Sequence, residues 1–167
     1  MTYLGLLHYY LGIEVDQKPK HIFISQKKYV GELLNKFGIQ DCNPVSTPME
    51  QNLKLTSNEC SAFEDPTKCR QLVGSLIYLT ATRPNINFVV GTLFRFMHHP
   101  CEGHWNAAKR VFKYLKGTQP YGIKYSKFSN FHLTGYSDSN FDGDKEHGVS
   151  TSCYLMNLGL AAITWRS

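Results

Sequence analysis

Three aspartates lie close together near the C-terminal end of the sequence, in the string Gly-Tyr-Ser-Asp-Ser-Asn-Phe-Asp-Gly-Asp. They are Asp138, Asp142 and Asp144, and His147 follows them. Carboxylates are the ligands that Mg²⁺ and Ca²⁺ prefer, but the calcium-loop pattern is not met because Glu146 follows too soon. Asp138 stays open as a weak Mg²⁺ ligand completed by groups from elsewhere, whereas a solvated turn is the favoured interpretation of Asp142 and Asp144.

A second group of metal-ligating residue types is His98, His99, Cys101 and His104. Zinc takes such ligands, but a closed structural site needs a tetrahedral set at suitable spacing. Pro100 stands between two predicted helices here, so a role at the helix junction is favoured over a zinc site.

Basic side chains form the best candidate surface for nucleic acid. Lys109, Arg110, Lys113 and Lys116 recur on one face of a predicted helix, opposite an apolar stripe. Cations on such a face can approach phosphates without unfolding the helix, and each phosphate contact makes binding more salt-dependent. The alternative is an ordinary solvated face, which basic amphipathic helices often have.

Aromatic side chains near the N-terminus are candidates for stacking on bases. Tyr9, Tyr10, Phe23 and Tyr29 have the ring faces that such stacking needs. At these spacings aromatic residues more often belong to a core, so packing is the favoured reading.

Composition narrows the class of protein. The 167 residues are 42% hydrophobic and carry 18 Lys+Arg against 13 Asp+Glu, a formal charge of +5. That excess suits a polyanionic partner without requiring one. No apolar run approaches the ~20 residues that cross a bilayer, so we expect no membrane partner.

The cysteines indicate the compartment. Five are present, at positions 42, 60, 69, 101 and 153, and no pair has Cys-x-x-Cys spacing. Free thiols in a reducing compartment are therefore expected. The N-terminus lacks the basic and long apolar regions of a secretory signal. Together these features predict an intracellular protein, cytoplasmic or nuclear and not secreted.

The elements that must position these residues can be read from periodicity. A β-hairpin is expected over Leu7–Ile24, and a helix from Ser25 to Gly38. A connector rich in Pro, Ser, Thr and Asn fills 41–64. Asp65-Pro66 then starts a helix, because an acidic N-cap followed by proline favours that position, and Arg83-Pro84 ends it.

Two further helices and a set of strands complete the chain. The helices are expected after Pro84 and from about Trp105 to Gly117, and the strands over 121–125, 131–137, 151–158 and 161–165. This order predicts an α+β fold, with a β-hairpin and helices followed by an antiparallel β-meander. No segment remains to cover the second face of the meander, so we expect it to be incomplete.

Five strings, in order along the chain, resemble copia-type LTR retrotransposon Pol polyproteins. They are LHYYLGIEV, FISQKKYVGELLNKFGIQDCNPVSTPME, CRQLVGSLIYLTATRPNINFVVGTLFRFMHHP, HWNAAKRVFKYLKGT and GYSDSNFDGD. The resemblance implies four regions: 1–40 as the end of a reverse transcriptase palm and the start of a thumb, 41–64 as a linker, 65–117 as thumb- or connection-like helices, and 118–167 as a truncated ribonuclease-H-like domain.

The resemblance also implies Mg²⁺ chemistry, of which this chain carries a part. Reverse transcriptases hold their metals at a Tyr-x-Asp-Asp turn, which the sequence does not contain. Asp138 is similar to the first carboxylate of the ribonuclease H site, whereas the family's next acid follows the strand around Trp165. Asn140 stands where the family commonly has an acid, and Gly148-Val149 where it has Arg-Lys. We therefore expect a catalytically inactive fragment that binds no metal tightly.

Three functional hypotheses follow. The first is weak binding of an RNA/DNA hybrid or duplex, with the rest of a Pol polyprotein as a further partner. The second is a protein-interaction module retained by a host, because exposed strand edges favour pairing with another chain. The third is a non-functional pseudogene product.

Overall fold

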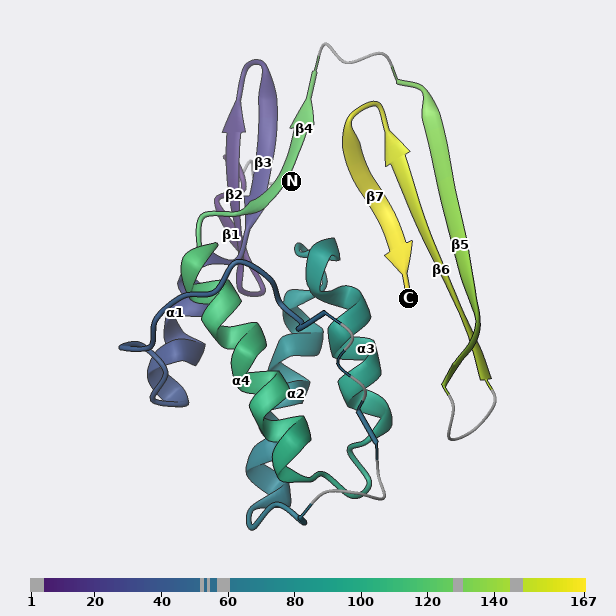
Figure 1. The fold of residues 1–167 in the computed structure, drawn as a ribbon. Helices are drawn as coiled ribbons and strands as arrows, with labels where there is room; N and C mark the ends of the chain where they lie inside the picture. The colour runs from purple at the N-terminus through teal and green to yellow at the C-terminus, as the bar shows by residue number, and fades with distance from the viewer. Residues whose placement is uncertain (1–4, 52, 54, 57–60, 128–130, 145–148) are drawn as a thin grey trace. The chain divides into compact units, whose positions relative to one another are not determined.

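A computed structural model describes residues 5–51, 53, 55–56, 61–127, 131–144 and 149–167, and for 140–144 and 149–151 the backbone alone. The chain divides into two compact units, Met1–Tyr29 with Pro120–Ser167 and Val30–Gln119. The first is built mainly from strands and the second from helices, as Figure 1 shows. The predicted α+β class is confirmed.

The N-terminal hairpin is present and has an additional short strand. β1 (Tyr9–Tyr10), β2 (Ile13–Lys18) and β3 (His21–Ser25) pair antiparallel in that order. Leu11 and Gly12 form the turn between β1 and β2 with φ values of 46° and 77°. Two positive φ angles at a two-residue turn match the right-handed twist of the strands that it joins.

The fourth strand of this sheet comes from a distant part of the chain. β4 (Gly122–Ser126) pairs antiparallel with β3, so that Ile123 lies opposite Ile24. A Cβ at Gly122 would collide with the Ile24 carbonyl oxygen and lie 2.8 Å from the Phe23 ring, so only glycine permits this approach. The strand predicted at 121–125 therefore exists, but its partner is the hairpin and not the next predicted strand.

A separate antiparallel sheet follows. It consists of β5 (Leu133–Asp144), β6 (Val149–Leu158) and β7 (Ala161–Arg166) in the order β5-β6-β7. Gly159, with φ 62°, helps to form the two-residue turn between β6 and β7. The meander predicted for this part of the chain is confirmed for these three strands, whereas its likeness to ribonuclease H stays a prediction.

Asp65-Pro66 and Gly38 mark helix ends as predicted, but two other predicted bounds are wrong. α1 (Lys27–Lys36) is followed by Gly38, whose φ is 66°. α2 (Pro66–Leu79) starts at Asp65, whose carboxylate accepts a hydrogen bond from the Lys68 backbone N–H at 2.9 Å. Such caps satisfy backbone groups that the helix itself leaves without partners. However, α1 begins at Lys27 and not directly after Ser25, and α2 ends at Leu79 with Thr80 as its C-cap, before the predicted end at Arg83-Pro84.

The third predicted helix is divided. A short 3₁₀ helix, η1 (Pro84–Ile86), leads into α3 (Asn87–Arg95), and α4 (Glu102–Gly117) follows. α2, α3 and α4 lie side by side in Figure 1 and contact one another. Side chains with no exposed surface form their core: Leu72, Val73, Leu76, Leu79, Leu93, Ala108, Val111, Phe112 and Leu115.

A buried arginine fixes the C-terminal end of α4. The Arg83 side chain, 2% exposed, donates from Nη1 to the Thr118 carbonyl oxygen at 2.9 Å and from Nη2 to Thr118 Oγ1 at 2.5 Å. Thr118 Oγ1 in turn donates to the Tyr114 carbonyl oxygen at 2.9 Å. These charge-assisted bonds connect the start of η1 to the last turn of α4 and so orient the helix that carries the predicted basic face.

The four predicted regions, 1–40, 41–64, 65–117 and 118–167, rest on the family resemblance and stay a prediction. Their bounds differ from those of the two compact units.

Among the residues that the structure describes, the helices are too short or too polar to span a bilayer.

Candidate nucleic-acid interface

α4 has two chemically different faces. Ala108, Val111, Phe112 and Leu115 are fully buried, whereas Lys109, Arg110, Lys113 and Lys116 are half-buried on the other side. The two sets alternate at the ~3.6-residue repeat of a helix, which is why one sequence supplies both. The four predicted cations therefore share one helix face.

The connector holds one of these cations. Arg110 Nη1 donates to Glu50 Oε1 at 2.9 Å, and Arg110 Nη2 donates to Thr47 Oγ1 at 3.1 Å. The Arg110 side chain is 26% exposed and the Glu50 side chain 60% exposed. The guanidinium thus already has an anionic partner within its own chain.

A second cation is engaged at the end of the helix. Lys116 Nζ donates to the Cys42 carbonyl oxygen at 2.6 Å. At Gly117 an added Cβ would lie 3.0 Å from the Cβ of Pro44, which shows how closely the connector passes. The segment 41–64 is therefore not a free linker over its first part, because it packs along α4.

A third cation lies over an aromatic ring. Lys109 Nζ is 5.7 Å from the centroid of the Trp105 ring, and Lys68 Nζ is also 5.7 Å from it. Phe63 stacks on Trp105 with ring centroids 4.8 Å apart. A cation over an indole face is stabilised by the ring quadrupole, so Lys109 is oriented but still accessible from solvent.

Lys113 lies between these contacts on the same face. It is half-buried, and no residue among those that the structure describes forms an ion pair or hydrogen bond with its ammonium group. Sequence periodicity brings the four cations together correctly. Periodicity does not predict that the connector contacts Arg110 and Lys116, because these contacts join residues 60 to 74 positions apart.

The histidines at the α3–α4 junction have structural partners. His104 is 1% exposed, its Nδ1 accepts the Cys101 backbone N–H at 3.1 Å, and its ring stacks on Phe96 with centroids 4.4 Å apart. His98 lies on the surface, and its carbonyl oxygen accepts a hydrogen bond from Arg70. Among the described residues, no group of three or more His, Cys, Asp or Glu could hold a metal ion.

The prediction that all five thiols are free is wrong at Cys101. Cys42, Cys69 and Cys153 are free, but Cys101 is disulfide-bonded. The backbone of Ala62 pairs with that of Cys101, so the end of the connector runs beside the start of α4. Spacing along the sequence cannot reveal such a long-range approach. Cys60 lies outside the described residues.

The acidic string falls on β5. Asp138 is exposed and lies opposite Cys153 of β6. Its cross-strand and same-face neighbours include Tyr136 and Leu155, which are neutral, so these described neighbours add no carboxylate of the kind that a two-metal site needs. The side chains of Asp142 and Asp144, and all of His147, lie outside the described residues.

The aromatic residues of the hairpin are divided between surface and interior. Tyr9 and Tyr10 are 49% and 60% exposed, whereas Phe23 and Tyr29 are half-buried. Lys28 Nζ lies 5.6 Å from the centroid of the Tyr9 ring. The favoured core role therefore fits Phe23 and Tyr29 better than the two tyrosines of β1.

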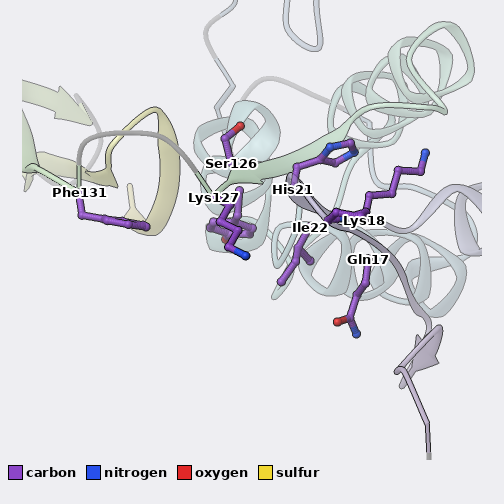
Figure 2. Close-up of a pocket in the computed structure, with 9 residues that line it drawn as sticks. Gln17, Lys18, His21, Ile22, Ser126, Lys127 and Phe131 are labelled. Atoms are coloured by element: carbon purple, nitrogen blue, oxygen red, sulfur yellow. The ribbon is translucent and has the colours of Figure 1, made fainter.

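A hollow that the sequence did not predict lies at the end of the hairpin. It has a volume of about 450 Å³. Figure 2 shows residues that line it, among them Lys18 of β2, His21 of β3, Lys127 just after β4 and Phe131 before β5. Beside it Tyr125 donates its hydroxyl to the Ala162 carbonyl oxygen at 3.0 Å, and burial raises the pKa of this phenol. The pairing of β3 with β4 creates the hollow, and no local sequence pattern predicts that pairing.

Comparison with known proteins agrees with the sequence strings. Residues 1–51 match the family described as reverse transcriptase (RNA-dependent DNA polymerase). The chain is 42% identical over 161 residues to the retrovirus-related Pol polyprotein from transposon RE2 of Arabidopsis thaliana, a match that covers 96% of this chain and 11% of that protein.

Two other relatives match nearly the whole chain. The mitochondrial protein AtMg00810 of Arabidopsis thaliana is 39% identical over 99% of this chain and 68% of its own length. The retrovirus-related Pol polyprotein from transposon TNT 1-94 of Nicotiana tabacum is 32% identical over 100% of this chain and 13% of that protein. No solved structure matches the chain.

Proposed function

The chain belongs to the family of copia-type retrotransposon Pol polyproteins, and on that premise we propose that it binds duplex nucleic acid, DNA or an RNA/DNA hybrid, through the basic face of α4. The chain spans 11% of the length of the RE2 polyprotein, so the activity of a whole Pol polyprotein is itself a proposal here. One observation carries this function: Lys109, Arg110, Lys113 and Lys116 share one face of a helix whose opposite face is buried.

The proposed interaction is electrostatic and independent of sequence. Lysine and arginine side chains on a rigid helix neutralise phosphates and release counterions, which lowers affinity as salt rises. The buried core fixes α4, so the cations approach a duplex without a folding step. Binding that uses all four cations has an expected slope of log affinity against log salt of about −3 to −4 on B-DNA.

We further propose that the chain does not cleave the hybrid that it binds. The β5–β7 sheet supports the proposal that 118–167 resembles the opening strands of ribonuclease H, with Asp138 as the relic carboxylate. Asp138 has neutral neighbours on its face of the sheet, so we propose that it holds Mg²⁺ weakly at most. A cleavage assay with Mg²⁺ tests this, and robust cutting that is lost in Asp138→Asn would contradict it.

The binding experiment compares matched charge reversals. Wild type and the triple variant Lys109→Glu, Arg110→Glu, Lys113→Glu are titrated with a labelled hybrid by fluorescence anisotropy at several salt concentrations. The control variant carries Lys27→Glu, Lys36→Glu and Arg166→Glu, at exposed positions outside α4. We expect the first variant to lose binding and the control to retain most of it. No affinity of the wild type at low salt, or equal losses in both variants, would contradict the proposal.

A second candidate, of another class, is a protein-interaction surface on the β5–β7 sheet. Leu133 and Tyr136 of β5 are 62% and 59% exposed, and Ile163 of β7 is 43% exposed. Exposed apolar residues along a strand that forms the edge of a sheet favour pairing with another chain. Sizing chromatography tests this: a monomer at all concentrations, with no change in Tyr136→Lys, would leave nucleic-acid binding as the better account.

A further inference from the structure

We propose that the connector segment Cys42–Glu50 is an internal strap that competes with nucleic-acid phosphates for the basic face of α4. This inference rests on the proposed function and concerns the regulation of the same site. It assigns the connector a second role, beyond joining two parts of the chain.

The geometry of the strap follows the helix. Cys42 contacts Lys116 and Pro44 approaches Gly117 at the C-terminal end of α4, whereas Thr47 and Glu50 contact Arg110 about two turns earlier. The connector therefore runs antiparallel to α4, along the face that carries the cations. Because the connector contacts α4 at three successive places, it lies along the helix as a strap and does not touch it at one point only.

The chemical groups of the strap resemble those of a nucleic-acid backbone. Arg110 donates to a carboxylate oxygen of Glu50 and to the hydroxyl oxygen of Thr47, and Lys116 donates to the backbone carbonyl oxygen of Cys42. A guanidinium binds carboxylate and phosphate oxygens in the same forked geometry. Glu50 thus supplies an anion at a position where a bound duplex would supply a phosphate.

The strap is held weakly enough to be displaced. The Glu50 side chain is 60% exposed, and a pair with so exposed a partner is screened by water and salt. Pro44 and Pro48 restrict the connector, which lowers the entropy cost of keeping it along the helix. When the strap occupies the face in some of the molecules, the apparent affinity equals the intrinsic affinity multiplied by the fraction of molecules in which the face is open.

Weakening the strap should therefore strengthen binding. For Glu50→Ala we expect the affinity for a labelled RNA/DNA hybrid at low salt to rise about two- to five-fold, which is the range that the loss of one exposed ion pair allows. Thr47→Val removes a contact with Arg110 without changing the net charge, and we expect a smaller rise in the same direction.

Two controls separate the strap from a general charge effect. Glu32→Ala, at an exposed position of α1, adds the same net charge as Glu50→Ala and should change affinity much less. In the Arg110→Ala background, Glu50→Ala should give no increase beyond that of Glu32→Ala, because its expected effect depends on the guanidinium. Thermal unfolding followed by circular dichroism confirms that each variant remains folded.

The outcomes distinguish the strap from the proposed function. A rise in Glu50→Ala that exceeds Glu32→Ala and disappears with Arg110→Ala supports the strap. Binding by the wild type with equal affinities for Glu50→Ala and Glu32→Ala overturns the strap and leaves the proposed function intact. No binding by the wild type or by Glu50→Ala overturns both.

Discussion

The helical unit and the β5–β7 sheet differ in how far their apolar side chains are exposed to solvent. α2, α3 and α4 enclose a core in which Leu72, Val111 and Phe112 have no exposed surface. In the sheet, Leu133 and Tyr136 are 62% and 59% exposed, and Leu160 in the turn between β6 and β7 is 91% exposed. The helical unit therefore has the means to hold its cations in fixed positions, whereas the sheet presents its side chains to solvent.

This difference bears directly on function. A surface made of phosphate-binding side chains needs a rigid support, and the buried face of α4 provides it. Asp138, on the sheet, has the neutral Tyr136 and Leu155 near it among the side chains that the structure describes. The helical unit is therefore the part of the chain to which we assign the proposed binding.

The largest expected effect is the loss of a core side chain. Phe112 is fully buried and its ring lies 5.5 Å from that of Phe37 in an edge contact. We expect Phe112→Ala to lower the free energy of unfolding by about 3–5 kcal/mol, because it leaves a cavity among packed helices. Leu160→Ala, at a 91% exposed position in the turn between β6 and β7, should change it by less than about 0.5 kcal/mol. Equal effects in urea unfolding would contradict the contrast between the two regions.

A smaller effect is expected where β4 meets β3. Gly122→Ala places a Cβ against the Ile24 carbonyl oxygen and should destabilise the β1–β4 sheet by about 1–3 kcal/mol. Gly31→Ala in α1 is the matched control, because a Cβ there meets nothing within 4 Å and helix propensity favours alanine. Stability should fall in the first variant and hold or rise in the second. Hydrogen exchange of the β3 amides should accelerate in Gly122→Ala alone.

The N-cap of α2 provides a third test. Asp65→Ala removes the acceptor of the Lys68 N–H and should cost about 1 kcal/mol in free energy of unfolding. Asp65→Asn keeps an acceptor at the cap and should restore most of the stability. A loss of stability in the asparagine variant equal to that in the alanine variant would mean that the cap does not act through this hydrogen bond.

The last prediction concerns the reactivity of the free cysteines and involves no change in stability. Cys69 has no exposed surface, and burial raises the pKa of its thiol although the nearby Arg70 opposes the shift. Cys42 and Cys153 are half-exposed. In iodoacetamide labelling at pH 8 under native conditions, Cys69 should react only after unfolding, because the thiolate is the reactive form. Labelling of all three at similar rates would contradict the packing of α2.

Much of the helical unit could be predicted from local signals. Asp65-Pro66, Gly38 and Gly117 mark helix ends because capping depends on a few neighbouring residues. The cations of α4 share a face for the same reason, since the helical repeat is local. The division of the third helix into η1 and α3 is a minor departure at Pro84.

What the sequence did not predict depends on contacts between distant residues. The pairing of β4 with β3, the backbone pairing of Ala62 with Cys101 and the contact of Glu50 with Arg110 each join segments far apart in the chain. Composition and periodicity report which face of an element is apolar, but they do not report which segment covers it. The strap along α4 is therefore a property of the folded chain alone.

The salt dependence of nucleic-acid binding tests the central claim most directly. The affinity of the wild type for a labelled RNA/DNA hybrid is measured between low and moderate salt, beside the variant with Lys109→Glu, Arg110→Glu and Lys113→Glu. We predict measurable, sequence-independent binding that weakens steeply with salt in the wild type, and little binding by the variant. Binding by the variant with the same affinity and the same salt slope as the wild type would contradict a role for the basic face of α4.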